Sequence, residues 1–455
     1  MSNRLPNDLI DHLKGDPQFD YEAFIAVHDH EQKTASIRIN PAKNFDVSAL
    51  DVDKAIPWCN GGYYLKERPK FTLDPLYHAG CYYSQEASSM FLDLAIRALG
   101  LTEQPIKALD LCAAPGGKST LIQGALSSDS MLVANEIIKN RVLVLNDNLV
   151  RWGGHNVVVS NNDPSAFSRL PGYFDLMVVD APCSGSGMFH KDHDAIEEWS
   201  LANVKLCSER QKRILADSLV SLKTGGYLFY STCSYSKEEN EGIVDWIIDE
   251  FDFENVPLAV ADSWGIHLTQ TDKHQATGYR FYPHQVEGEG FFCAVLKKKA
   301  LQQGFSMKKL KTEKSGIPQN LPQQWVNMEE NFAFLHHDHI HVFPKAYETD
   351  LVALQKVLYL KNAGTTIGKL VGKEIIPSHD LALSNLIQPN IPAIDLSLAD
   401  SLCFLRKDNL GTEINPEGLK GWVLMRYKGV NLGWIKAISN RINNYYPKEL
   451  RIQHL

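Results

Sequence analysis

The chain lacks most of the features that mark special classes of protein. No apolar run among its 455 residues reaches the roughly 18 needed to cross a bilayer, and its first residues lack the apolar core of a secretory signal. Its eight cysteines form no C-x-x-C pair and are too few for a disulfide scaffold. No internal repeat or low-complexity tract is present. We therefore expect a cytoplasmic globular protein, in which a special cysteine is catalytic or metal-bound rather than bridged.

The net charge is −8, but its distribution is uneven. At 44% hydrophobic and 22% charged residues, the composition is that of an ordinary soluble protein of roughly two to four domains. Residues 420–455 instead carry seven cations against one acid. The cations are Lys420, Arg426, Lys428, Lys436, Arg441, Lys448 and Arg451. The aromatics between them are Trp422, Tyr427, Trp434, Tyr445 and Tyr446. The pattern fits an RNA-binding surface and, equally, the solvated basic face of a small β-rich domain.

Short apolar runs alternate with helical patterns between residues 106 and 250. The predicted strands are Ile106–Cys112, Met131–Asn135, Val157–Ser160, Phe174–Asp180 and Tyr227–Thr232. The first predicted helix begins near Lys118. The others cover Ile138–Trp152, Ile196–Ser221 and Glu238–Glu250. This alternation predicts a Rossmann-like α/β domain, a parallel sheet covered by helices on both faces. The apolar run Gly290–Leu296 predicts a late edge strand.

Four segments follow from the changes in pattern. Residues 1–105 form an N-terminal α+β domain, and residues 106–300 form the α/β domain. Residues 301–375 hold a linker and an intermediate domain, the polar stretch Lys308–Gly316 being the linker. Residues 376–455 form a compact, mainly β domain.

A glycine-rich loop follows the first predicted strand, from Asp110 to Thr120. Such a loop at the carboxyl end of a strand lets backbone approach a ligand closely. Its sequence matches neither G-x-x-x-x-G-K-[ST] nor G-x-G-x-x-G, so no phosphate cradle is predicted.

Carboxylates follow the next two strands. Glu136 is placed to accept hydrogen bonds from the two hydroxyls of a ribose, and Asp163 to read an adenine amino group. In register with the glycine loop, they indicate a nucleoside ligand without a pyrophosphate. S-adenosylmethionine is the predicted cofactor.

Two cysteines stand at the ends of the fourth and fifth strands, Cys183 in Asp180-Ala181-Pro182-Cys183 and Cys233 in Thr232-Cys233-Ser234. A single cysteine is most often a small buried hydrophobe. These two lie beside small residues at strand ends, where both would face the ligand crevice. We interpret the others as structural: Cys59, Cys81, Cys207, Cys293 and Cys403, with Cys112 packed in the glycine loop.

Methylation of a pyrimidine carbon requires a thiol and an acid placed in this way. C5 of cytosine is too weak a nucleophile to attack a methyl sulfonium, but a thiolate that adds to C6 makes C5 enamine-like. An acid near N3 assists the addition, and Asp180 is the candidate. The residues alone do not decide which cysteine is the nucleophile.

Three ordered motifs resemble the RNA 5-methylcytosine methyltransferases. They are Leu111-Cys112-Ala113-Ala114-Pro115-Gly116-Gly117-Lys118, Asp180-Ala181-Pro182-Cys183-Ser184-Gly185 and Ser231-Thr232-Cys233-Ser234. Residues 83–90 and 280–292 agree, so the resemblance covers roughly residues 20–300. The tail around Leu432-Gly433-Trp434 and Asn443-Asn444-Tyr445-Tyr446-Pro447 is similar to the PUA-like domain of the bacterial YebU/RsmF branch.

The resemblance implies roles and partners. Cys233 matches the nucleophile, Cys183 the cysteine that assists product release, and Asp180 the acid beside the base. The implied cofactor contacts are Cys112, Ala113, Ala114, Pro115, Gly116, Gly117, Lys118, Glu136, Asp163 and Asp180. The implied substrate is small-subunit ribosomal RNA, in an assembled or partly assembled subunit, held by RNA-binding N-terminal and PUA-like domains. We expect a monomer.

Two histidine-bearing segments need separate interpretation. His190 and His193 stand where the family often has arginine and proline, which makes charge there depend on pH. On one strand, His337, His339 and His341 would share a face and offer three imidazoles to zinc. No cysteine or acidic cluster completes such a site, and we expect no metal.

Three alternatives remain open. The same chemistry on tRNA would be separated by activity on naked tRNA against assembled subunits. An RNA-binding assembly factor on an inactive methyltransferase fold is opposed by the intact Gly116-Gly117-Lys118, Cys183 and Cys233. A DNA methyltransferase is disfavoured by the separate Thr-Cys motif and the tail.

Overall fold

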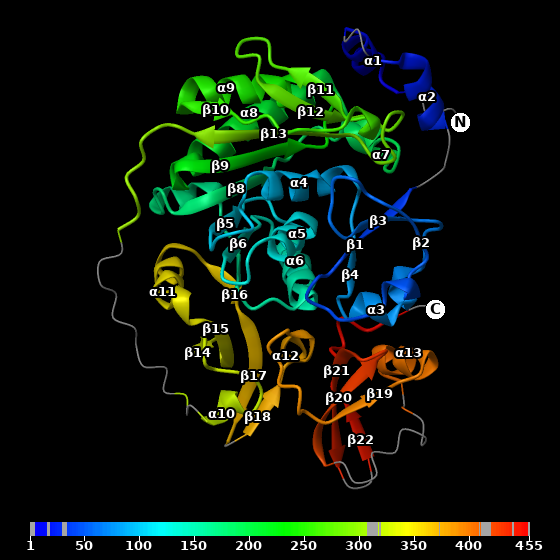
Figure 1. The fold of residues 1–455 in the computed structure, drawn as a ribbon, viewed down its shortest axis with the longest axis vertical. Helices are drawn as coiled ribbons and strands as arrows, with labels where there is room; N and C mark the ends of the chain where they lie inside the picture. Colours follow the sequence, from blue (N-terminus) through cyan, green and yellow to red (C-terminus); the bar gives the residue numbers. More distant parts are fainter. Residues whose placement is uncertain are drawn as a thin grey trace.

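The computed structural model describes residues 5–15, 19–29, 34–306, 317, 320–372, 374–408, 410, 420–438 and 441–453. Figure 1 shows a large mixed sheet at one end of the molecule, the N-terminal sheet beside it, and two small sheets at the other end. The predicted linker Lys308–Gly316 lies outside the described residues. Among the described helices, none combines the length and apolarity that crossing a membrane requires.

The central sheet has the strand order β11-β12-β13-β9-β8-β5-β6-β7-β16. Its parallel strands are β5 (Lys107–Asp110), β6 (Met131–Asn135), β7 (Val157–Ser160), β8 (Phe174–Asp180) and β9 (Leu222–Thr232). Its antiparallel strands are β10 (Phe253–Asn255), β11 (His267–Gln270), β12 (Thr277–Phe281), β13 (Phe291–Lys298) and β16 (Leu360–Ala363). The strand order reverses between β5 and β8, and a crevice for ligands opens at the carboxyl ends of strands at such a point.

Helices cover both faces of this sheet, as the sequence predicts. One apolar core includes Phe91, Leu121 and Leu145, and the other includes Leu215, Ile243 and Leu354. The helices over the first core are α4 (Phe91–Ala98), α5 (Gly117–Ala125) and α6 (Lys139–Trp152). Those over the second are α8 (Leu201–Ser218), α9 (Glu241–Phe251) and α11 (Glu348–Val357). The Rossmann-like fold is confirmed.

The N-terminal segment divides into a sheet and a helical pair. The sheet has the order β2-β3-β1-β4, with β1 (Ala35–Ile39), β2 (Val52–Ala55), β3 (Gly62–Leu65) and β4 (Tyr82–Ser84), and α3 (Pro75–His78) lies beside it. Helices α1 (Asn7–Leu13) and α2 (Tyr21–Asp29) pack instead on the α/β domain (Figure 1). There Phe24 of α2 contacts the rings of Tyr235 and Tyr282.

Two four-stranded sheets make up the far end of the molecule. The first is built from β14 (Asn331–His336), β15 (His339–Pro344), β17 (Thr365–Val371) and β18 (Glu374–Pro377). The second is built from β19 (Ala393–Asp395), β20 (Gly421–Tyr427), β21 (Val430–Ile438) and β22 (Arg441–Asn444). The helices here are α10 (Asn320–Gln323), α12 (His379–Leu383) and α13 (Leu398–Arg406). The two sheets share one apolar core, to which Ile367 and Trp434 contribute.

Three expectations about elements are corrected. The predicted helix Ile196–Ser221 is two helices, α7 (Asp194–Glu198) and α8, because Ser200 begins a new helix by accepting the Asn203 N–H at 3.1 Å. The strand β13 is not an edge strand, since it lies between β9 and β12. The segment 301–375 does not keep to itself, because its strand β16 pairs with β7 of the central sheet.

Candidate active site

The candidate site is a cavity of about 430 Å³ at the carboxyl ends of the parallel strands. It is lined from the glycine loop, from the loops after β6, β7, β8 and β9, and from helix α8. Its lining residues include Cys112, Ala114, Glu136, Ile137, Ile138, Arg141, Asp163, Pro164, Asp180, Pro182, Cys183, Arg213, Asp217 and Cys233. The structure therefore brings the predicted carboxylates and both cysteines of interest to one cavity.

The glycine loop is held in shape by α6. Asn148 donates to the carbonyl of Pro115 at 2.6 Å, and Arg141 donates to the carbonyl of Ala114 at 2.7 Å. Gly116 has φ of +114°, a conformation that residues with a side chain rarely adopt. Cys112 and Ala114 line the cavity, whereas Ala113, Pro115, Gly116 and Gly117 are not among its lining residues.

The strand-end acids differ in their surroundings. Glu136 is buried, accepts the Ile138 N–H at 2.9 Å and lies 3.6 Å from Arg141. Asp163 is exposed and accepts both the N–H and the hydroxyl of Ser165. These hydrogen bonds lower the pKa of Asp163, which keeps it an ionised acceptor.

Two apolar side chains missed by the sequence reasoning also face the cavity. Ile137 and Ile138 are each 50% exposed, which is unusual for isoleucine, and they follow Glu136 directly. Their signal in the sequence is an apolar pair after a strand-end acid, which we assigned to the start of a helix. The cavity therefore presents a buried acid beside an apolar wall.

The two cysteines meet across neighbouring strands. The Sγ atoms of Cys183 and Cys233 lie 3.1 Å apart, within hydrogen-bond distance for sulfur. Strands β8 and β9 pair Asp180 with Ser231, so their following loops start side by side. Gly187 then donates its N–H to the carbonyl of Cys233 at 2.8 Å. The bond to Cys233, with burial, raises the pKa of Cys183 well above its ordinary value.

Asp180 lies between two donors at the end of β8. Lys118 Nζ is 2.8 Å from Asp180 Oδ2, and the Ser231 hydroxyl donates to Oδ1 at 2.9 Å. Burial would lower the pKa of Lys118, but the charges of Asp180 and Asp110 outweigh it and raise that pKa. Lys118 is therefore a firmly charged ammonium beside Asp180, a lining residue of the cavity, although Lys118 itself is not among the lining residues. The motif alone does not reveal this pairing.

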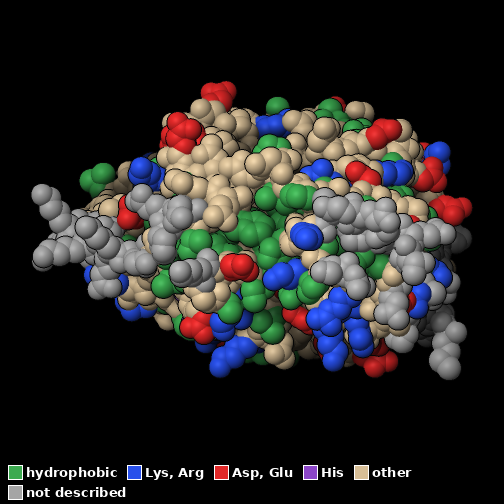
Figure 2. All heavy atoms as spheres, turned by 90° about the horizontal axis from the view of Figure 1, so that it is seen from below, with side chains coloured by type: hydrophobic (Ala, Val, Ile, Leu, Met, Phe, Trp, Pro, Cys, Tyr) green, Lys and Arg blue, Asp and Glu red, His purple; other side chains and the backbone are tan. Residues whose placement is uncertain are grey.

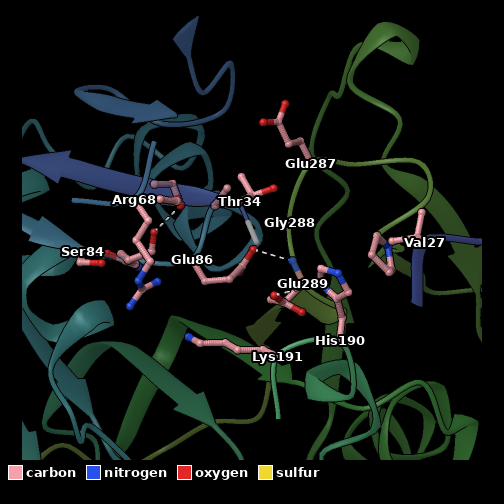
Figure 3. A pocket seen from close by; sticks show the side chains of 15 residues that line it. Val27, Thr34, Arg68, Ser84, Glu86, His190, Lys191, Glu287, Gly288 and Glu289 are labelled. Carbon is pink, nitrogen blue, oxygen red and sulfur yellow. Dashed lines mark hydrogen bonds and ion pairs between the residues drawn. The ribbon is translucent and has the colours of Figure 1, made fainter. Parts of the chain in front are cut away.

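A second cavity, of about 480 Å³, lies between the N-terminal sheet and the catalytic domain (Figure 3). Glu86 accepts the N–H of Glu289 at 2.9 Å and so ties the two walls together. His190 Nδ1 lies 3.5 Å from Glu289 Oε1, so this histidine faces a carboxylate in place of a free surface. Gly290 donates to the carbonyl of Gly187, which connects this cavity's wall to the cysteine loops.

The predicted RNA-binding tail is only partly as expected. Of its cations, Lys420, Arg441, Lys448 and Arg451 are exposed, whereas Arg426 and Lys436 are half-buried. Lys436 Nζ lies 5.0 Å from the ring centre of Trp422, which packs edge-on to Tyr445. Figure 2 shows this end of the molecule, where Lys and Arg side chains gather along one edge beside apolar ones.

Two of the tail aromatics are not available for stacking on bases. Trp434 is buried and donates its indole N–H to the carbonyl of Ser378 at 2.7 Å. Tyr446 is buried against His379 and Phe404. Trp434 enters its core from β21, where alternate residues face opposite sides of the sheet, and Tyr446 enters another core from the segment after β22.

The histidine cluster forms a hairpin rather than one strand face. His337 and Asp338, with φ of +48° and +55°, make the turn between β14 and β15. His336 pairs with His339 across the strands, and buried His341 bonds the carbonyl of Ala363. Within the described ranges, no group of histidine, cysteine or acidic side chains is arranged to hold a metal ion.

The strand order, the glycine loop and the strand-end carboxylates define a methyltransferase of the Rossmann-like class. Three family models match successive parts of the chain: the N-terminal domain of 16S rRNA methyltransferase RsmF at residues 5–87, 16S rRNA methyltransferase RsmB/F at 97–297, and the methyltransferase RsmF PUA domain at 391–452. The chain belongs to the ribosomal RNA small subunit methyltransferase F family, which confirms the resemblance seen in the motifs.

Individual relatives agree over most of the length. The ribosomal RNA small subunit methyltransferase F of Vibrio parahaemolyticus is 30% identical over 456 residues, with 91% of each chain covered. That of Aeromonas hydrophila is 30% identical, covering 87% of this chain and 85% of its own. A methyltransferase homolog protein from Pyrococcus horikoshii has a solved structure that is 29% identical, with a TM-score of 0.55 over 65% of this chain and 96% of that one.

Proposed function

We propose that this protein is an S-adenosylmethionine-dependent 16S rRNA (cytosine-C5) methyltransferase. The observation that carries the proposal is the 3.1 Å approach of the Cys183 and Cys233 sulfurs in a cavity that also holds the strand-end acids. A methyltransferase acting on an amino nitrogen needs no thiol, because its target has a lone pair. Two thiols at the cofactor crevice fit a reaction in which one adds to the base and the other helps to remove it.

In the proposed mechanism, a flipped cytosine enters the cavity beside Asp180. The Cys233 thiolate adds to C6, and the electron pair of the C5–C6 bond becomes available at C5. Bound S-adenosylmethionine supplies the electrophilic methyl group. A base then takes the proton from C5, and the C6–S bond breaks to restore the double bond. Cys183, held as a thiol by its raised pKa, is placed beside the leaving sulfur and can return a proton to it.

Asp180 and Lys118 act together at N3 in this mechanism. Negative charge develops at N3 as the thiolate adds, and a nearby proton stabilises it. Asp180 accepts hydrogen bonds from both Lys118 and Ser231, which hold its carboxyl group in place at the end of β8. In the proposed step Asp180 takes a proton from solvent and shares it with N3, while Lys118 keeps its own proton and its charge. Asp180 thus orients the base, and Lys118 supplies the positive charge that offsets the added electron pair.

The test uses Cys183→Ala protein with cofactor and ribosomal RNA on a denaturing gel. A protein–RNA band that disappears in the Cys183→Ala/Cys233→Ala double variant supports the thiol mechanism and both cysteine roles. Cys207→Ala, a change to a buried cysteine outside the cavity, is the matched control and should give no band. Full methylation by Cys233→Ala would contradict the assignment of the nucleophile.

The substrate arms of the same test separate the related functions. We propose that small-subunit ribosomal RNA is the substrate, which the names of the relatives and the PUA match support. We propose further that the enzyme is a cytoplasmic monomer that acts on an assembled or partly assembled subunit. A band with naked tRNA alone would favour the tRNA alternative. No band with subunits, ribosomal RNA or tRNA would favour a non-catalytic assembly factor.

A further inference from the structure

A buried acid links the two cysteine loops from behind the cavity. Glu239 lies in the short 3-10 helix Lys237–Glu239 before α9, and its side chain is fully buried. It accepts the N–H of Ser184 at 2.8 Å and the Ser184 hydroxyl at 2.5 Å. It also accepts the Ser234 hydroxyl at 2.6 Å. Since Ser184 follows Cys183 and Ser234 follows Cys233, one carboxylate holds the neighbours of both thiols.

Three further side chains hold Glu239 and the loops beside it, and one of them, Gln211, bonds the carboxylate itself. Gln211 of α8 donates to Glu239 at 3.2 Å and to the carbonyl of Pro182 at 3.1 Å. The Tyr230 hydroxyl donates to the backbone carbonyl of Glu239 at 2.6 Å. Asn240 donates to the carbonyl of Ser234 at 2.7 Å. Helix α8 therefore holds the carboxylate, strand β9 holds the backbone of Glu239, and Asn240 at the start of α9 holds the loop after Cys233.

Burying a charged residue such as Glu239 costs free energy, because the carboxylate loses its contact with water. Burial raises the pKa of Glu239, and the hydrogen bonds from Ser184, Ser234 and Gln211 oppose that rise. A carboxylate accepts at every lone pair, so it satisfies several converging donors at once, and bonds to a charged acceptor are stronger than neutral ones. Glu239 is not among the residues that line the cavity.

We infer that Glu239 is a positioning residue that locks the Cys183 and Cys233 loops into one unit and so sets the approach of the two sulfurs. Its connection to catalysis rests on the function proposed above, but its effect on thiol geometry does not. The hydrogen bonds reach the residues next to each cysteine and leave both sulfurs free for chemistry. Small displacements of reacting groups slow a reaction strongly. Holding the two loops in place is therefore expected to affect the rate.

The experiment compares Glu239→Gln, Glu239→Asp and Glu239→Ala with the unchanged protein. The primary readout needs no RNA. It is the rate at which iodoacetamide alkylates Cys183 and the rate at which it alkylates Cys233, each measured by mass spectrometry at several pH values. We expect Glu239→Gln to bind S-adenosylmethionine normally while the ratio of the two alkylation rates and its pH dependence change. With substrate, kcat should fall by about ten- to a hundredfold with KM little changed.

The matched control is Glu241→Gln, two residues further along. Glu241 is equally buried, but it pairs with Arg280 at 2.5 Å and is not a lining residue of the cavity. This change should lower the melting temperature and leave the ratio of alkylation rates unchanged. An unchanged ratio and kcat in a folded Glu239→Gln or Glu239→Asp protein would overturn the inference, as would the same change in ratio in the control. An altered ratio in a protein with no methylation activity would retain the positioning role of Glu239 and reject the proposed function.

Discussion

The ammonium of Lys118 and the carboxylate of Asp180 lie 2.8 Å apart at the edge of the cavity that holds both cysteines. The two come from different segments: Lys118 from the first turn of α5, and Asp180 from the last position of β8. Lys118 also lies 5.1 Å from the ring centre of Phe291, so α5, β8 and β13 meet at this pair. A charged donor is therefore held beside the group assigned to N3 of the base.

Lys118→Met is expected to lower kcat for methylation by about a hundredfold, because the variant has no positive charge to offset the electron pair arriving at N3. Lys118→Arg keeps the charge and should retain more of the activity. Single-turnover methylation with saturating cofactor measures the effect. Equal rates for the methionine and arginine variants would show that the charge at this position is not used.

Glu136→Ala is expected to weaken S-adenosylmethionine binding by about 1.5–3 kcal/mol, because alanine cannot make the charge-assisted hydrogen bonds to the ribose hydroxyls. Calorimetric titration of the cofactor in the absence of RNA measures the change. Asp217→Asn is the matched control, since Asp217 lines the same cavity from α8 and not from a strand end. An affinity that is unaffected in Glu136→Ala would remove the ribose assignment.

His379 should make the protein sensitive to acid. Burial, helped by the charges of His78 and Arg151, lowers the pKa of His379 to about 3, against about 6.5 when unfolded. Its stabilising share is therefore complete above about pH 6.5 and declines as pH falls toward 3, by about 1.4 kcal/mol per unit.

The matching measurement is urea unfolding between pH 7 and pH 4. His379→Gln, neutral throughout, should show a shallower loss of stability on acidification than the unchanged protein. Exposed His193, changed to glutamine, is the comparison for replacing a histidine at the surface. Parallel pH curves for the unchanged protein and His379→Gln would contradict the prediction.

Lys436→Glu with Arg441→Glu is expected to weaken RNA binding and reduce its dependence on salt, by about one unit of log–log slope for each phosphate that is no longer neutralised. Cofactor affinity should not change, because both residues lie in the far sheet. Lys297→Glu with Lys299→Glu, of similar exposure on the catalytic domain, is the control pair. Filter binding at several salt concentrations measures both effects. An RNA affinity that is unchanged in the tail variant would contradict the proposed role of the tail in RNA binding.

The sequence was most informative where chemistry and strand ends coincide. Glu136, Asp163, Asp180, Cys183 and Cys233 were placed at strand ends by alternation alone, and the structure gathers them at one cavity. Parallel strands put their carboxyl ends at the same edge, so order along the chain was enough.

What sequence reasoning missed depends on contacts between distant segments. Trp434 looked like an RNA-facing aromatic, yet it fills a core shared by two small sheets, one of which the pattern did not define. Glu239 looks like one acid in an acidic run, and only the folded chain brings Ser184 and Ser234 to it. The break before Ser200 was hidden because its cap depends on a local hydrogen bond inside a continuous helical pattern.

The C-terminal sheet and the N-terminal sheet share an apolar core, in which Val423, Met425 and Ile435 pack with Ile37 and Leu76. Separating the two sheets would expose that core to water, and the free-energy cost would be roughly 25 cal/mol for each Å² of apolar surface exposed. The C-terminal sheet is therefore held in a fixed position relative to the N-terminal sheet. An RNA bound by the C-terminal sheet, as we propose, would reach the two cysteines at a distance that this shared core sets.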